Sequence, residues 1–246
     1  MTAGRASGPL AGEDTLVACW RALARTSSDA TVVQTSGAIV ATFPSFAPMN
    51  NAIMSRPHDA DLAAEADRLK DAYRRAGVSS WAAWIRSRAT SFAAADAIRE
   101  LTDFKRDTTT LVMEAKRLSR FRTSSDVRLA CVDAASRAGD EPVPVSDLGV
   151  PNADEELAAW VMVDGDVAVA GAYRYLHGSD CGVYAVGTTP AWRRRGLARR
   201  LVEHLLADAS RRGAQSATLQ STSMAQNLYA SLGFAPVGRY EEWVPE

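Results

Sequence analysis

Hydrophobic residues recur at helical spacing in some segments of the chain and alternate with polar residues, as in strands, in others. Glycine, proline and small polar residues separate these segments and indicate turns. In the first half the pattern predicts helices at 14–26, 59–75 and 92–101 and strands at 31–35, 38–43, 80–86 and 104–115. In the second half it predicts strands at 128–132, 158–163, 167–176, 182–188, 216–221 and 239–244 and helices at 195–212 and 223–232. The expected fold class is therefore α/β, with a mixed sheet of the α+β kind flanked by helices.

An internal repeat connects the two halves. The segment AADAIRELTDF, residues 94–104, aligns with MAQNLYASLGF, residues 224–234. Both halves also end in the order helix, strand, helix, strand, and a shared order of elements supports a repeat more strongly than the letters alone. Chance similarity between two alanine-rich helices is the alternative. The sequence therefore predicts a tandem arrangement of two lobes with the same architecture.

Composition and punctuation give the expected boundaries of these lobes. The first residues are rich in glycine, alanine and serine, and the segment RFRTSSDV is polar enough to be a linker. We expect a disordered N-terminus at 1–13, a first lobe at 14–119, a linker at 120–127 and a second lobe at 128–246.

The overall composition excludes several classes of protein. Of the 246 residues, 47% are hydrophobic and 23% charged, which is typical of globular domains. The formal net charge of −1 argues against a protein that coats nucleic acid. The cysteines, Cys19, Cys131 and Cys181, are far apart and odd in number, which favours reduced thiols over disulfides or a zinc site. With no apolar run long enough for a membrane span and no signal peptide, the expected localisation is cytoplasmic.

The segment PAWRRRGLARR, residues 190–200, concentrates five arginines where a strand gives way to a helix. The first turn of a helix carries unpaired N–H groups and a partial positive charge, and it therefore attracts phosphates. Gly196 has no side chain, so a phosphate could approach the backbone closely there, and Ala198 is the next smallest choice. The flanking arginines add charge. The segment therefore predicts a diphosphate site, and it lacks the lysine of a nucleotide-hydrolysing phosphate loop.

The helix that follows is amphipathic. Leu197, Leu201, Val202 and Leu205 form an inward stripe, so the pattern places His204 and Asp208 on the solvent side. None of the three histidines has a partner at metal-ligand spacing, and we expect no metal site.

The stretch VGTTPAWRRRGLARRLVEHLL resembles the coenzyme A signature of the GNAT superfamily of N-acetyltransferases. The signature [Q/R]-x-x-G-x-[G/A] corresponds to Arg193, Gly196 and Ala198. The downstream segment AQNLYASLGF resembles the family's A-x-x-L-Y-x-x-x-G-F block, one strand later. The resemblance covers about residues 155–246, and it implies a GNAT fold.

The resemblance also implies roles for particular residues. In the family, the strand before the signature binds the pantetheine arm through its backbone, which points to Val186 and Thr188. The tyrosine of the second block corresponds to Tyr229, which would protonate the departing thiolate; a packed helix tyrosine is the alternative. The backbone of the signature would hold the diphosphate, through the residues Arg193, Arg194, Arg195, Gly196, Leu197, Ala198 and Arg199.

The second lobe departs from the family pattern at Thr222, where many members have asparagine. A hydroxyl replaces only one of the two hydrogen bonds of an amide, so one coenzyme contact is in question. The general base is not evident from the sequence, and Asp180 or a chain of waters are the alternatives.

The first lobe lacks the signature. Its segment RPHDADLAAEADRLK, residues 56–70, is acidic and contains no glycine, and acidic groups would repel a diphosphate. The position that matches Tyr229 is Arg99, and the position that matches Gly233 is Asp103. We therefore expect a degenerate GNAT-like lobe without a coenzyme site.

The Asn50-Asn51 pair in this lobe is either a functional feature or a polar turn.

The resemblance implies an N-acetyltransferase that transfers an acetyl group from acetyl-CoA to a primary amine by direct attack in a ternary complex. The acceptor would be a small molecule or a peptide, with no nucleic acid and no membrane as partner, and the protein would be a monomer or homodimer. A catalytically inactive coenzyme A-binding regulator is the alternative. A third interpretation, nucleic-acid binding through the arginines, is weaker because aromatic residues do not interleave with them beyond Trp192.

The strand at 167–176 has four residues on one face that either line an acceptor groove or pack the core: Val169, Gly171, Tyr173 and Tyr175.

Overall fold

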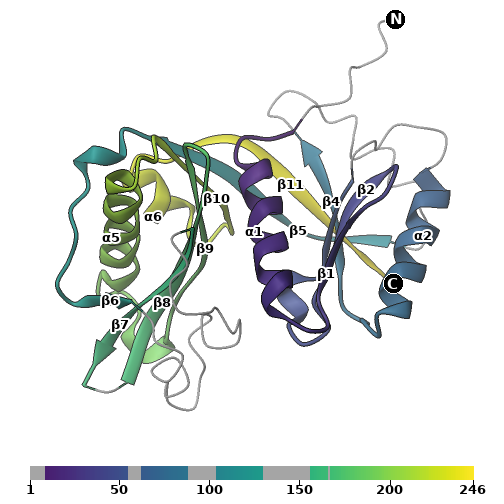
Figure 1. Ribbon diagram of the computed structural model, residues 1–246, viewed down its shortest axis with the longest axis horizontal. Coiled ribbons are helices and arrows are strands. Elements are labelled where there is room, and N and C mark those ends of the chain that lie inside the picture. Colours follow the sequence, from purple (N-terminus) through teal and green to yellow (C-terminus); the bar gives the residue numbers. More distant parts are fainter. Residues whose placement is uncertain (1–8, 55–61, 88–103, 130–155, 166) are drawn as a thin grey trace, which may run out of the picture.

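Helices cover both faces of a long mixed sheet in the computed structural model, which describes residues 9–54, 62–87, 104–129, 156–165 and 167–246 (Figure 1). The strands are β1 (Thr31–Gln34), β2 (Ala38–Thr42), β3 (Asn51–Met54), β4 (Ala82–Ser87), β5 (Phe104–Lys116), β6 (Val127–Leu129), β7 (Leu157–Asp164), β8 (Val167–His177), β9 (Asp180–Thr188), β10 (Ser216–Ser221) and β11 (Ala235–Pro245). The α-helices are α1 (Glu13–Thr26), α2 (Leu62–Arg75), α5 (Leu197–Arg211) and α6 (Gln226–Ser231). Short 3₁₀ turns lie at Ala47–Met49, Leu118–Arg120 and Pro190–Trp192.

The described strands form a single sheet in the order β1-β2-β3-β4-β11-β5-β10-β9-β8-β7-β6. Two parallel pairs, β3 with β4 and β9 with β10, occupy equivalent places in its two halves. Every other pairing is antiparallel. The pattern of the first half is thus repeated in the second, as the sequence repeat predicts.

The two halves exchange their last strands at the centre of the sheet. β5, the last strand of the first half in sequence, pairs with β10 of the second half. β11, the last strand of the chain, pairs with β4 of the first half. β5 and β11 then pair with each other, with Leu111 opposite Arg239. Each half therefore completes the sheet of the other.

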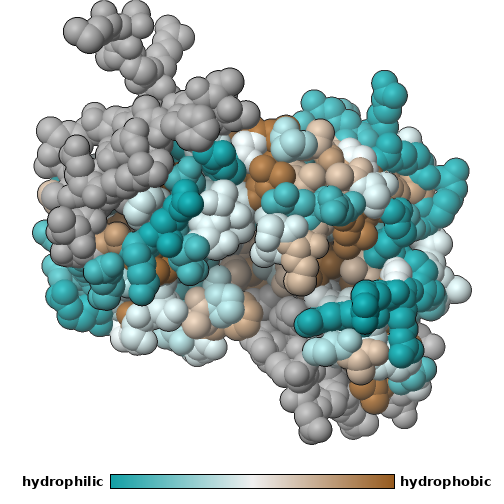
Figure 2. Space-filling view, turned by 180° about the vertical axis from the view of Figure 1, so that it is seen from behind, coloured by the Kyte–Doolittle hydropathy of each residue, from teal (hydrophilic) through white to brown (hydrophobic). Residues whose placement is uncertain are grey.

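Hydrophobic burial divides the core into three clusters. Leu201, Leu205 and the rest of the inner face of α5 pack with Tyr229 of α6 on one face of the second half. α1 lies between the two halves in Figure 1 and buries Trp20 against β4 and β8 residues. α2 covers the first half through Leu69 and Tyr73. On the face seen in Figure 2, hydrophobic residues form small groups among polar ones.

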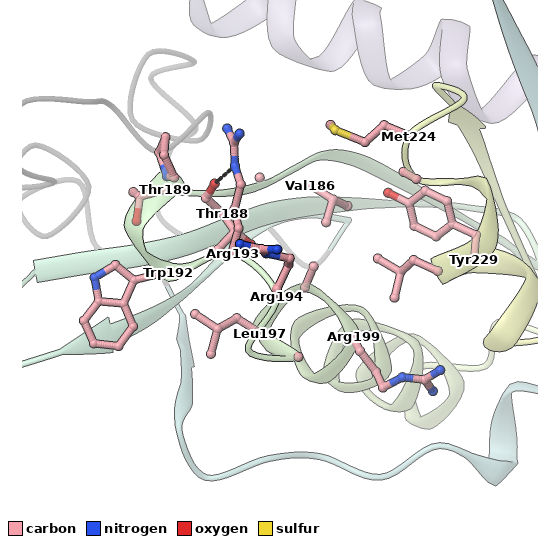
Figure 3. A pocket seen from close by; sticks show the side chains of 16 residues that line it. Val186, Thr188, Thr189, Trp192, Arg193, Arg194, Leu197, Arg199, Met224 and Tyr229 are labelled. Atoms are coloured by element: carbon pink, nitrogen blue, oxygen red, sulfur yellow. Dashed lines mark hydrogen bonds between the residues drawn. The ribbon is translucent and has the colours of Figure 1, made fainter.

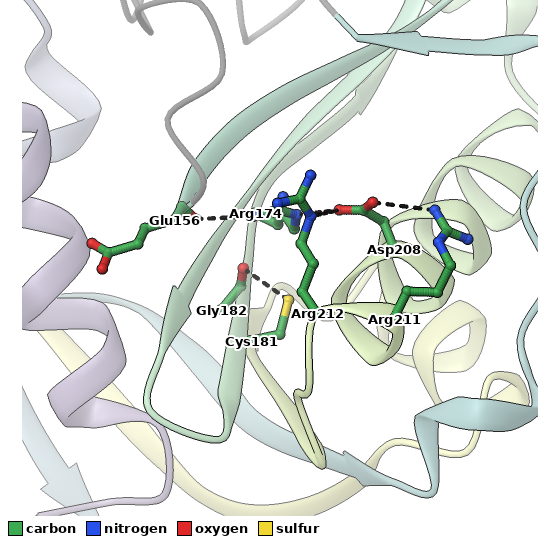
Figure 4. A network of polar contacts seen from close by, with 7 residues as sticks. All are labelled: Glu156, Arg174, Cys181, Gly182, Asp208, Arg211 and Arg212. Carbon is green, nitrogen blue, oxygen red and sulfur yellow. Dashed lines mark hydrogen bonds and ion pairs between the residues drawn. The ribbon is translucent and has the colours of Figure 1, made fainter.

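Two predictions about exposure are wrong. His204 and Asp208 are 6% and 5% exposed, although the amphipathic pattern of α5 places them outside. His204 packs against Trp160 and its Nδ1 accepts a hydrogen bond from the Ser124 N–H. Asp208 pairs with the fully buried Arg174, and also with Arg211 and Arg212 (Figure 4). A helix covered on two sides has no single solvent face, which the periodicity alone does not reveal.

The predicted helices and strands that fall within the described residues occur there, with shifted ends. β3 is an addition, because four residues beginning with asparagine give too short a pattern to identify. The predicted helix at 92–101 and most of the strand at 128–132 lie outside the described residues. The predicted disordered tail ends earlier than residue 13, because Leu10 is buried and α1 begins at Glu13; residues 1–8 are outside the described part.

None of the described helices has the length and apolar character needed to cross a lipid bilayer.

Candidate active site

Strands β9 and β10 pair at one end and separate at the other. Their parallel ladder joins Asp180 to Ser216 and ends where Gly182 faces Thr218. β9 then continues to Thr188, while β10 from Leu219 onward pairs only with β5 among the described strands. The backbone of β9 beyond Gly182 is therefore open on its β10 side.

A β-bulge occurs in the open part of β9. Gly187 pairs with Gly171 and Tyr184 with Tyr173, so Ala185 and Val186 together face a single residue of β8. Ala185 has a φ of 49°, which L-residues rarely adopt. A bulge re-aims the backbone groups beside it, and Val186 and Gly187 in this part of β9 line a cavity.

The turn at residues 193–199 follows β9 and opens α5. Arg194 and Gly196 have φ values of 62° and 76°, so the backbone turns through two left-handed residues immediately before the helix begins. No described side chain caps α5 at Gly196, so the first N–H groups of the helix have no side-chain partner. Gly196 is required by its backbone angle rather than by crowding, since a Cβ there would meet no atom within 4 Å.

The open part of β9, this turn and the start of α6 enclose a cavity of about 620 Å³ (Figure 3). Nine of the eleven residues that the sequence predicts for the site line it: Val186, Thr188, Arg193, Arg194, Gly196, Leu197, Ala198, Arg199 and Tyr229. The fold thus brings together residues from two motifs that are separate in the sequence, at an end of α5 with a positive dipole.

Tyr229 is 6% exposed, and its hydroxyl points across the cavity towards Val186 of β9 (Figure 3). Its ring packs edge-on against Phe234, with 5.9 Å between centroids. Burial raises the pKa of the Tyr229 phenol to about 12. The phenol therefore stays protonated throughout the neutral range and is a permanent hydrogen-bond donor.

The arginines of the turn have different positions. The Nε of Arg193 donates to the Thr188 carbonyl at 3.2 Å, which ties the turn to the end of β9. Arg199 bonds Ser231 and Glu203 and thereby links α5 to α6. Arg195 does not line the cavity; its guanidinium lies 4.5 Å from the centroid of the Trp192 ring. Arg195 thus supports the wall from outside.

Thr222 also lies outside the set of cavity-lining residues. Its carbonyl accepts hydrogen bonds from the Ala225 N–H and from the Ser221 hydroxyl, which forms the turn before α6. In the structure the residue therefore shapes that turn.

Asp180, one alternative for a general base, lies at the paired end of β9. Its carboxylate accepts hydrogen bonds from the hydroxyls of Thr15, Ser216 and Thr218 at 2.7 to 2.8 Å. Three hydroxyl donors from α1 and β10 occupy it, and it does not line the cavity. Its contacts are those of a structural anchor for α1.

Other residues singled out by the sequence prove to be structural. Tyr173 and Tyr175 pack in the cluster beneath α1, which favours the core over the acceptor groove for these two. Asn50 accepts a hydrogen bond from the Phe43 N–H, and Asn51 donates to the Pro48 carbonyl. Both asparagines are buried, so the pair forms a polar turn that leads into β3.

Sequence reasoning missed several lining residues, among them Trp192, Met224, Ala225 and Leu228. Ala225 and Leu228 belong to the second motif, and Ala225 precedes Tyr229 by four residues, one helical turn, which is a signal that could have found it. Met224 and the bulge at Ala185 have no such signal. In the described part of the chain, no cluster of histidine, cysteine or acidic residues has the arrangement of a metal site.

Residues 155–236 match the family model described as an acetyltransferase (GNAT) domain. No curated protein matches the chain in sequence.

Solved structures with the same fold cover nearly the whole chain. A GCN5-related N-acetyltransferase from Kribbella flavida has a TM-score of 0.68 at 16% identity, over 94% of each chain. One from Sphaerobacter thermophilus has a TM-score of 0.56 at 14% identity, over 95% of this chain and 85% of its own. A tandem GNAT protein from the clavulanic acid biosynthesis pathway has a TM-score of 0.56 at 13% identity, over 97% of each chain. At such identities the similarity shows the fold, including its tandem form.

Proposed function

We propose that the protein is an acetyl-CoA-dependent N-acetyltransferase acting on a primary amine, on the premise that residues 155–236 match the acetyltransferase (GNAT) domain model. The acceptor is a small molecule or a peptide. The second lobe carries the reaction, and no metal takes part.

The observation that carries this proposal is the cavity where β9 separates from β10 at the uncapped end of α5. Its phosphate-binding end offers backbone N–H groups and the side chains of Arg193 and Arg194. Its other end is apolar, with Val186, Leu228 and the ring of Tyr229. A diphosphate joined to a long, flexible, largely apolar arm matches this division, and coenzyme A has that chemistry.

The reaction follows from what these groups can do. A neutral amine attacks the thioester carbonyl carbon, and the C–S bond breaks as the thiolate leaves. A backbone N–H of β9 beside the Ala185 bulge donates to the carbonyl oxygen as it gains charge. The ternary complex holds amine and thioester together, which accounts for much of the acceleration. The amine proton passes to water or to a base.

Tyr229 donates its phenolic proton to the departing sulfur. With its pKa raised to about 12, the phenol is a weaker acid than a free tyrosine. The difference between its pKa and that of a thiol is therefore larger than for an unperturbed tyrosine. Its contribution is therefore a hydrogen bond to the developing thiolate, followed by proton transfer.

We propose that residues 14–119 are a degenerate lobe without a coenzyme site, joined by the linker at 120–127 to the catalytic lobe at 128–246. Arg86 of β4 supports this division. Its guanidinium donates to the carbonyl of Met54, the last residue of β3, and to both carboxylate oxygens of Glu13. Arg86 thus bridges β3 and β4 at the end of their ladder. At the equivalent place in the second half, β9 and β10 separate.

Thermal unfolding with and without acetyl-CoA tests coenzyme binding. At about 100 times Kd, we expect the Tm to rise by about 5–10 °C. Gly196→Glu should abolish the shift, because a carboxylate repels the diphosphate and the backbone angle is strained. Gly178→Glu is the matched control: its φ of 57° and open surroundings give the same strain and charge at the β8–β9 turn, and the shift should persist.

An amine library with thiol release as the readout then tests turnover. Thiol release with one amine class establishes the acceptor. A coenzyme-induced Tm shift with no thiol release from any amine would instead favour a regulatory coenzyme A-binding protein. No Tm shift across a wide concentration range would overturn both.

A further inference from the structure

Met224 is an exposed hydrophobic residue at the edge of the cavity. It is 83% exposed, whereas the other described methionines, Met49, Met54, Met113 and Met162, are at most 9% exposed. It lies on the turn between β10 and α6, whose geometry is fixed by the bond from the Ala225 N–H to the Thr222 carbonyl. A long apolar side chain in this position has nothing of the described chain to cover it, although it lines the cavity.

The position of Met224 indicates what would cover it. Figure 3 shows its side chain beside the Tyr229 hydroxyl, on the side of the cavity where β9 runs past Val186. A ligand arm that follows β9 towards Tyr229 would pass beneath the thioether. Methionine is unbranched and polarisable, and it adapts its shape to a flexible aliphatic arm.

The same exposure makes the sulfur reactive. Oxidation of methionine follows the accessibility of its thioether, and the product, a sulfoxide, is polar and chiral. The two described cysteines, Cys19 and Cys181, are buried, and burial raises the pKa of both thiols, so they present no reactive thiolate. Among the described sulfur-containing side chains, Met224 is therefore the one open to an oxidant.

We propose that Met224 is an oxidation-sensitive cover of the coenzyme site. With coenzyme bound, its thioether packs on the aliphatic arm and is shielded. In the free protein, a peroxide oxidises it: sulfur gives up two electrons, one peroxide oxygen bonds to sulfur, the O–O bond breaks and the other oxygen leaves as water. The resulting sulfoxide cannot pack on an apolar arm, and coenzyme affinity falls. The inference rests on the proposed function for the identity of the ligand.

The first experiment measures protection. The full-length protein is treated with hydrogen peroxide with and without coenzyme A, and sulfoxide formation at each methionine is followed by peptide mass spectrometry. Met224 should oxidise first, and saturating coenzyme A should slow its oxidation on the order of tenfold, because reactivity follows exposure. Met113 and Met162 in the same digest are internal references that should remain unmodified.

The second experiment measures the consequence. Coenzyme affinity is compared before and after peroxide within each protein. In the wild type Kd should rise about tenfold, the effect of losing about two methylene-sized apolar contacts. Met224→Leu keeps an apolar side chain without sulfur, so its Kd should not respond to peroxide. Met224→Gln, which imitates the polarity of the sulfoxide, should show the raised Kd without treatment. All proteins carry Cys131→Ser, so that no thiol outside the described residues reacts.

The outcomes separate the two proposals. If coenzyme A raises the Tm but Met224 oxidises at an unchanged rate, the inference is wrong and the proposed function stands. Protection without any change in Kd after oxidation would also overturn it, as would an equal loss of affinity in Met224→Leu. If coenzyme A neither raises the Tm nor protects Met224, the proposed function fails and the inference fails with it.

Discussion

The two parallel strand pairs of the sheet have the same pairing but different ends. β9 and β10 separate after Gly182, and β9 continues through the Ala185 bulge to the cavity. β3 pairs with β4 as far as Ile53 and ends at Met54, where Arg86 bonds its carbonyl. A shared topology therefore does not give a shared site. What differs among the described residues is that a side chain of the chain itself, Arg86, bonds the backbone at the end of the β3–β4 ladder.

The charged groups also differ between the open pair, β9 with β10, and the closed pair, β3 with β4. The open pair faces the uncapped helix end and the arginines of the turn at 193–199, which suit an anionic ligand. At the closed pair, the cation Arg86 is 6% exposed and neutralised by Glu13, whose carboxylate also accepts a hydrogen bond from Tyr240 at 2.8 Å. The closed pair, β3 with β4, therefore uses its cation for stability, while the open pair, β9 with β10, has arginines that line the cavity.

The largest expected effect is on turnover at the open pair. Tyr229→Phe should lower kcat by about 100-fold, the lower end of the range for general acid catalysis, because the phenol's pKa of about 12 makes it a weak acid. Coenzyme affinity should change by less than about twofold, since the ring remains. Steady-state kinetics and calorimetric binding measure the two quantities. Tyr73→Phe is the matched control in the first half, because Tyr73 donates to the Ala41 carbonyl away from the cavity. An unchanged kcat in Tyr229→Phe would remove the phenol from the mechanism.

The next effect is on stability at the closed pair. Arg86→Ala should lower the free energy of unfolding by about 3–5 kcal/mol, because it leaves the Glu13 carboxylate buried without its cation. Replacing both partners, as Glu13→Gln with Arg86→Met, should recover much of this loss. Urea unfolding measures both variants.

The stoichiometry of the same variants sharpens the comparison. We expect Arg86→Ala to bind one coenzyme per chain in calorimetry. Removing the arginine frees the ends of β3 and β4, but the first half would still lack the coenzyme signature. A second equivalent bound by Arg86→Ala would show that the arginine alone closes a functional site.

A smaller effect is expected at the paired end of the open pair. Asp180→Ala removes the acceptor for three hydroxyls and should lower the unfolding free energy by about 2–3 kcal/mol. Thr15→Val, which removes one of these donors, should cost about 1 kcal/mol. The pH profile of acetyl transfer should not change in either variant. A shifted pH profile in Asp180→Ala would indicate that the Asp180 carboxylate acts as a general base.

The smallest effect is a pH dependence at His204, on α5 of the second half. Burial lowers the pKa of His204 below the ordinary value of about 6.5, so the unfolded chain takes up a proton more readily than the fold. The contribution of His204 to the free energy of unfolding is fully present above about pH 6.5. It declines as the pH falls towards the lowered pKa of the folded state. The Tm of the wild type should be lower at pH 5.5 than at pH 7.5, and His204→Asn should lack that part of the decrease. An identical pH dependence in both proteins would contradict this assignment.

Much of the local structure could be predicted from the sequence. The stripe of Leu201 and Leu205 gives α5, and Gly196 marks its first turn, because periodicity and backbone freedom are properties of neighbouring residues. The two motifs of the second half gave nine of the lining residues for the same reason: each motif is local, and the strand between them fixes their separation.

Other features could not be predicted, because they depend on residues far apart in the chain. Nothing in the pattern of β5 indicates that it pairs with β10, and nothing in α5 indicates that His204 meets Ser124. The bulge at Ala185 lies in a continuous run of apolar residues and glycines, CGVYAVG, in which no residue marks its position.

The sequence by itself determined the order of the elements and the repeat, and it predicted an anion site at the turn at 193–199. Spacing and residue chemistry are sufficient for these, whereas the role predicted for Tyr229 came from the resemblance to the GNAT family. The tertiary structure alone decided that the halves exchange strands, that β9 opens beyond Gly182 while Arg86 bridges β3 and β4, and that Met224 is left uncovered. These outcomes follow from hydrogen bonds and burial between distant segments, and such contacts exist only once the sheet has formed.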